Sequence, residues 1–168
     1  MDTIVNKVEE SGLVQLDLET FKPHQEIEEI DLKDQLWQGL VLKEKDFREW
    51  IKTHNWDSYT NKAVYIHCSA DAIVPTWAFV LVGLQLEGIA NQSLIGSKIG
   101  LLKKLISDNI NNLDIKQYQD ARVIIKGCSD IESPEYAMTI LVQRLKKVAK
   151  SIMYGEPCST VPLFKRKN

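Results

Sequence analysis

The chain has 168 residues, of which 44% are hydrophobic and 26% are charged, and its formal net charge at pH 7 is −2. These values are typical of a soluble globular protein, and they exclude a strongly basic nucleic-acid-binding protein. We therefore predict a single domain over residues 1–168, with loosely attached termini at 1–12 and 165–168, and no nucleic-acid partner.

Six strands are predicted along the chain. Residues 13–18 (LVQLDL) alternate between apolar and polar, which is the pattern of a half-buried strand. Short apolar runs predict the other strands, at 30–32, 36–42, 63–67 and 121–126, with an edge strand near 161–164.

Four helices are predicted from apolar residues at helical spacing, over 43–54, 75–88, 96–110 and 133–152. The helix that Pro75 opens is apolar on almost every face, so we expect it to be central and covered on several sides. The last helix has Ser133 as its expected N-cap and Pro134 at its first position, and Gly155 is expected to end it.

Strands that alternate with helices predict an α/β (or α+β) fold with a single mixed sheet of about four or five strands and helices packed on it. Two segments look alike, 63–78 (AVYIHCSADAIVPTWA) and 122–137 (RVIIKGCSDIESPEYA). If their strands are parallel neighbours, Cys68 and Cys128 lie at the same sheet edge, with sulfurs within roughly 10 Å. Ligands in open α/β sheets bind at that edge.

The three cysteines each precede a serine and stand at or beyond the end of an element. Thiolates that converge from separate loops can form a tetrahedral metal site, so we predict a zinc or iron site. Its predicted ligands are Cys68, Cys128, Cys158 and Asp71, with His67 or Asp130 as alternates for the fourth. No CxxC spacing supports this set of ligands. Two other interpretations of the cysteines stay open: they are small buried apolar residues, or one of them is a redox-active or persulfide-carrying thiol.

The segments CSADAIVPTWAF, GCSDIESPEYA and GEPCSTVPLFKRK resemble an uncharacterised bacterial family known only as domain of unknown function 2480. The resemblance covers most of the chain. It implies a small bacterial cytoplasmic protein and supplies no activity, cofactor or catalytic residue. The Cys-Ser turns also resemble, in a different order and spacing, the loops of iron–sulfur scaffold proteins, which use three cysteines and an Asp.

We expect the protein to be in the cytoplasm, because its first residues, MDTIVNKVEESG, are polar and do not resemble a secretory signal. We expect its thiols to be reduced, because the number of cysteines is odd. The longest apolar run, 72–86, is interrupted by polar residues and is too short to span a membrane, so no membrane contact is expected.

Two functions of different class follow. The first is a metal- or thiol-binding protein built on the cysteine turns. The second is a non-catalytic interaction or scaffold domain, or a homodimer built on the apolar helix 77–86, whose cysteines are merely buried. Sulfur or iron–sulfur handling is a third function, and an enzyme of unrecognised class stays open, although the chain has no Walker loop or GxGxxG motif.

Overall fold

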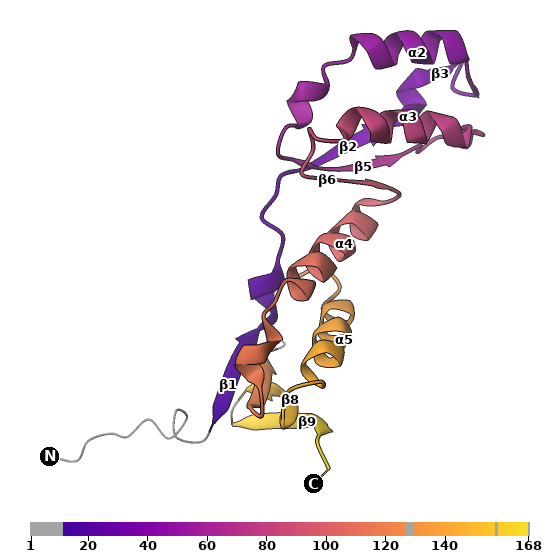
Figure 1. Cartoon of the computed structure of the whole chain (residues 1–168). Coiled ribbons are helices and arrows are strands. Elements are labelled where there is room, and N and C mark those ends of the chain that lie inside the picture. The colour runs from indigo at the N-terminus through magenta and orange to yellow at the C-terminus, as the bar shows by residue number, and fades with distance from the viewer. Residues whose placement is uncertain (1–11, 127–129, 157, 168) are drawn as a thin grey trace, which may run out of the picture. The chain divides into compact units, whose positions relative to one another are not determined.

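The computed structural model describes residues 12–126, 130–156 and 158–167 (Figure 1). The chain divides into two compact units, and each is described by itself. Unit 1 comprises Met1–Pro23 and Lys103–Asn168, and unit 2 comprises His24–Leu102. The boundary falls inside helix α4 (Lys98–Asn111). None of the described helices is long and apolar enough to cross a membrane.

Unit 1 contains a four-stranded sheet in the order β1-β7-β8-β9, in which the first three strands are parallel and β9 is antiparallel to β8. Its elements are β1 (Leu13–Asp17), η1 (Leu18–Phe21), η4 (Ile115–Tyr118), β7 (Arg122–Lys126), α5 (Pro134–Leu145), β8 (Ser151–Glu156) and β9 (Ser159–Lys165). The C-terminal part of α4 and α5 pack on one face of the sheet. The core residues include Leu16, Ile106, Ile110, Val123, Ile125, Leu141, Leu145 and Ile152.

Unit 2 contains a three-stranded parallel sheet in the order β2-β5-β6 and a separate two-stranded hairpin, β3-β4. Its elements are β2 (Ile27–Asp31), η2 (Leu32–Gln35), β3 (Leu36–Trp37), β4 (Val41–Leu42), α2 (Glu44–Thr53), η3 (Trp56–Tyr59), β5 (Ala63–His67), α3 (Thr76–Leu86) and β6 (Gln92–Ile95). The core residues include Ile30, Leu32, Phe47, Trp56, Val64, Ile66, Ala78, Val82 and Leu86.

The predicted single sheet is wrong, because the described strands form three sheets. The α/β class itself is confirmed, since strands alternate with helices in both units. The two look-alike strands are not neighbours: β5 pairs with β2 and β6, whereas β7 pairs with β1 and β8. Pairing depends on which apolar faces meet in the folded chain, and the likeness of two turns does not fix it.

Two predicted elements differ from the structure, and one strand was not predicted. Residues 36–42 form the β3-β4 hairpin, whose turn has positive φ at Gln38 and Gly39 (51° and 69°). The last helix ends at Leu145, and β8 occupies the region that we expected to be helical. Strand β6 was not predicted, because its sequence QSLI is short and half polar.

Helix α3 is buried on one side only, which corrects the prediction that it is covered on several sides. Ala78, Val82 and Leu86 are 0–1% exposed, whereas Val80 and Leu84 are 48% and 55% exposed. Residues four apart share a helix face, so Val80 and Leu84 form an apolar stripe open to solvent.

Candidate functional site

The turn after β5 lies at the carboxyl end of the unit 2 sheet. Strand β2 ends at Asp31 and β5 ends at His67, and these two residues are paired directly in the parallel register. Side chains alternate along a strand, so Asp31 and His67 share a sheet face with Glu29 and Tyr65, opposite the face that buries Ile30. Four polar side chains therefore gather on the face that α2 and α3 do not cover.

Asp31 ties the end of β2 to the turn after β5. Its carboxylate accepts hydrogen bonds from the Ser69 backbone N–H (3.0 Å), the Ser69 hydroxyl (2.5 Å) and the Lys33 backbone N–H (3.0 Å). The Lys33 ammonium lies 3.3 Å away. Burial raises the pKa of the Asp31 carboxyl, but the hydrogen bonds from Ser69 and Lys33 outweigh burial and hold the pKa well below its usual range.

Glu29 joins β2 to β5 through two further hydrogen bonds. Its Oε1 lies 2.9 Å from the Tyr65 hydroxyl and 2.7 Å from His67 Nε2. These bonds, from His67 first and Tyr65 second, lower the pKa of Glu29. Burial, followed by the bond to Glu29, raises the pKa of Tyr65. A carboxylate that holds one ring nitrogen fixes the orientation of an imidazole, which is how a histidine is prepared as a ligand or a base.

Two of the three predicted cysteine ligands lie in the described part of the chain, and they belong to different units. Cys68 belongs to unit 2, where it packs partly buried against the core and its Sγ lies 3.8 Å from the Ala70 carbonyl oxygen. Cys158 belongs to unit 1 and is exposed in the turn between β8 and β9. Cys128 lies outside the described residues. The expectation that the strands before Cys68 and Cys128 are parallel neighbours is wrong, because β5 and β7 belong to different sheets.

The two carboxylates proposed for the set belong to different units. Asp71 is exposed in unit 2, and Asp130 pairs with Lys22 in unit 1. Within the described part of the chain, no three His, Cys, Asp or Glu side chains are grouped so that they could hold a metal ion. A site that includes Cys128 is not tested by this finding and stays a prediction.

Unit 1 has a pocket of about 350 Å³ near the carboxyl end of its parallel strands. Leu18 follows β1, Pro134 begins α5, and Tyr154 lies towards the end of β8. The full lining comprises Leu18, Pro134, Glu135, Met138, Tyr154 and Leu163. Open α/β sheets bind ligands at this edge, and the mainly apolar side chains suit an apolar group.

The network around Asp31 was not among the predicted sites, because residues 30–32 were predicted only to form a short strand. A usable signal was present. Asp31 stands between two apolar residues, Ile30 and Leu32, which indicates a strand end followed by a turn in which the Asp side chain accepts a backbone N–H.

Comparison with protein families finds one match. Residues 2–166 match a family described as "Protein of unknown function (DUF2480)". Comparison with curated proteins and with solved structures finds no match. The bacterial, cytoplasmic origin that the resemblance implied stays a prediction.

Proposed function

We propose that this chain, which belongs to the DUF2480 family of proteins of unknown function, is a non-catalytic interaction domain. It forms a homodimer through the exposed stripe of α3. One observation carries the proposal. Val80 and Leu84 are 48% and 55% exposed on a helix that has no charged residue between Thr76 and Leu86.

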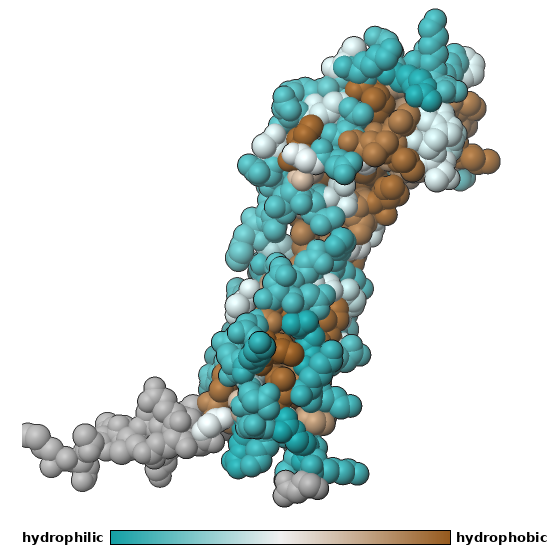
Figure 2. Space-filling view, in the orientation of Figure 1, coloured by the Kyte–Doolittle hydropathy of each residue, from teal (hydrophilic) through white to brown (hydrophobic). Residues whose placement is uncertain are grey.

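Apolar surface gathers over this helix in Figure 2. Ile73, three residues before α3, is 92% exposed, so the apolar stripe has a further large side chain at its N-terminal end. Exposed apolar patches on soluble proteins often mark sites of protein–protein interaction. Thr76 and Glu87 at the two ends of the helix are polar and exposed, as the rim of an interface is.

A second copy of the chain is the partner that this surface suits. A two-fold dimer brings the same patch of both subunits together, so the patch must be complementary to itself. An uncharged stripe meets its own copy without like-charge repulsion, whereas an acidic or basic stripe does not. Burying a fully exposed Val or Leu side chain contributes roughly 1.5–3 kcal/mol, and Val80 and Leu84, which are already about half buried, would each contribute about half of that.

The alternative function, a metal- or thiol-binding protein, has no supporting cluster among the described residues. This alternative can be tested directly by measuring the metal content of protein purified without a tag. Stoichiometric zinc or iron would favour it over the interaction domain.

The homodimer is tested with Leu84→Lys, with the molar mass measured by light scattering after size-exclusion chromatography. We expect the wild type to have twice the monomer mass at about 100 μM and the variant to be monomeric, because two facing lysines repel and lose their hydration. The matched control is Val161→Lys in β9 of unit 1, since Val161 is similarly exposed (59%) and should leave the dimer intact.

Circular dichroism must show that Leu84→Lys keeps the helical content of the wild type. A monomeric wild type, or a dimer that survives Leu84→Lys, contradicts the proposal.

A further inference from the structure

We propose that unit 1 binds a small organic phosphate in a second pocket, at the opposite end of its parallel strands from the apolar pocket. We call it the basic pocket, and its volume is about 370 Å³. Its lining comprises Arg122, Lys150, Ser151, Met153, Pro162, Phe164, Lys165 and Arg166.

Three adjacent strands place the polar residues of the basic pocket in one row. Arg122 of β7 is paired with Ser151 of β8, and Ser151 is paired with Lys165 of β9. Paired residues point to the same side of a sheet, and neighbouring strands are about 4.8 Å apart. Arg122 and Lys165 therefore stand on either side of the Ser151 hydroxyl. Because Val123 and Ile152 face the core, this row lies on the face that the helices leave open.

Arg166 holds the rim of the basic pocket in place. Its guanidinium pairs with Asp120 and also donates to the backbone carbonyls of Val148 (2.6 Å) and Ala149 (3.1 Å). These contacts join the end of β9 to the turns that precede β7 and β8. Arg166 is thus a positioning residue whose donors already have protein partners.

The other three cations are not held in ion pairs within the described chain, and the charge of Lys150 acts on Asp120 only at longer range. Arg122, Lys150 and Lys165 are exposed and make no ion pair with any residue in the described part of the chain. The one carboxylate paired at this rim is that of Asp120, which is bound to Arg166. Three cations around one pocket favour an anion with more than one negative charge, and a guanidinium matches two oxygens of a phosphate at once.

Met153 and Pro162, which are paired with each other, add apolar surface to the basic pocket, whereas Phe164 is paired with Ile152 and packs against the core. A free phosphate ion would leave this surface unused, whereas an organic phosphate with an apolar or aromatic portion would cover it. The volume lies within the range of small-molecule sites. The chemistry of the lining therefore assigns a compact phosphate ester as the ligand class.

Isothermal titration calorimetry with phenyl phosphate, inorganic phosphate and phenol tests the proposal on the full chain, in about 150 mM salt to screen non-specific attraction. We expect phenyl phosphate to bind at least about tenfold more tightly than either of the other two probes, because only phenyl phosphate satisfies both the cations and the apolar lining. Equal binding of phenyl phosphate and inorganic phosphate, or no binding of phenyl phosphate, overturns the assignment.

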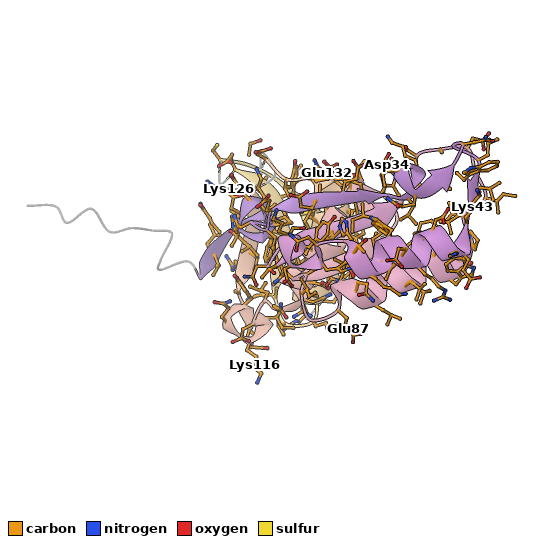
Figure 3. All side chains as sticks on the ribbon, turned by 90° about the horizontal axis from the view of Figure 1, so that it is seen from above. Asp34, Lys43, Glu87, Lys116, Lys126 and Glu132 are labelled. Carbon is orange, nitrogen blue, oxygen red and sulfur yellow. The ribbon has the colours of Figure 1, made fainter. Side chains whose placement is uncertain are left out.

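Variants locate the site. Arg122→Gln and Lys165→Gln should each weaken phenyl phosphate binding by about tenfold, because each loses a charged hydrogen bond to the ligand. The matched control is Lys116→Gln, which makes the same change of charge at an exposed lysine outside the basic pocket (Figure 3). A loss of equal size in Lys116→Gln would show a non-specific effect of net charge and overturn the site.

Thermal unfolding of each variant separates lost binding from lost folding, since the exposed Arg122 and Lys165 should alter stability little. A single-stranded oligonucleotide serves as the last probe. If it binds far more tightly than phenyl phosphate and depends on Arg122 and Lys165, the ligand is a nucleic acid and the small-molecule assignment is wrong.

Discussion

At the scale of single residues, two charged side chains hold parts of the chain that lie far apart in sequence. Asp31 binds Ser69, which is 38 residues away, and Arg166 binds Asp120, which is 46 residues away. Both act through hydrogen bonds to backbone as well as to side chains. Such contacts fix where strands end, and they place the polar groups at the strand ends of each sheet.

The ionised form of Asp31 should stabilise unit 2. Its pKa is lower in the folded protein than in the unfolded chain, so this stabilisation is complete above the unfolded pKa of about 4 and is lost as pH falls through the folded pKa. We predict that Asp31→Asn lowers the free energy of unfolding by about 1–2 kcal/mol at pH 7. Urea unfolding from pH 7 down to pH 3 should show the difference from wild type shrinking below pH 4.

Asp34→Asn is the matched control, because Asp34 is exposed on the adjoining 3-10 turn (Figure 3) and its side chain makes no ion pair or hydrogen bond within the described chain. Its effect should stay within about 0.5 kcal/mol at every pH. A pH-independent loss in Asp31→Asn would show that the carboxylate's charge is not what stabilises the turn.

At the scale of elements, the segment after α5 shows how an apolar pattern can be interpreted in two ways. Ala149 and Ile152 are buried, as the helical stripe predicted, but Ala149 lies in a turn and Ile152 lies in β8. Gly155, which we expected to end a helix, is instead in β8 with φ of +120°. It pairs with Thr160 across the β8-β9 hairpin.

Two glycine substitutions should have opposite effects. A Cβ at Gly155 would lie 2.4 Å from the Ser159 carbonyl oxygen, and its φ disfavours side chains, so Gly155→Ala should destabilise the protein by at least about 2 kcal/mol. A Cβ at Gly83, inside α3, would meet nothing within 4 Å. Gly83→Ala should therefore stabilise by about 0.4–1 kcal/mol, because alanine restricts the unfolded chain and favours the helix.

Thermal and urea unfolding measure both glycine variants. If Gly155→Ala were as stable as wild type, the β8-β9 hairpin would not have the described close approach.

At the scale of the whole molecule, each unit has its own core, and the boundary between the units falls inside α4. Leu101 in its first half is fully buried, while Ile106 and Ile110 in its second half belong to the core of unit 1. If the units unfolded separately, this helix would have to break in the middle. We therefore retain the proposal that residues 1–168 form a single cooperative domain.

The positions of the tryptophans give a direct test of cooperativity. All four, Trp37, Trp50, Trp56 and Trp77, lie in unit 2, so tryptophan fluorescence reports on that unit alone. Ile125→Ala, in the core of unit 1, should cost about 2–5 kcal/mol. In a single domain it should lower the fluorescence midpoint and the circular dichroism midpoint equally. A fluorescence midpoint that does not move would show two independent domains.

The sequence by itself determined the elements whose signal is local. Alternation predicted β1 over residues 13–18, and apolar runs predicted β5 at 63–67 and β7 at 121–126. Apolar residues at helical spacing predicted the four helices. These patterns can be recognised because they involve only residues that are close together in the sequence. The same reasoning placed Pro134 at the first position of α5. It also marked α3 as uncharged, which is the basis of the proposed dimer.

Only the tertiary structure decided how the strands are shared between sheets and which side chains meet. Strand pairing joins segments that are distant in the chain, so the partners of β5 and β7 could not be obtained from two similar segments. The row of Arg122, Ser151 and Lys165 arises in the same way. Each residue is ordinary in its own strand, and the row exists because three strands align in register.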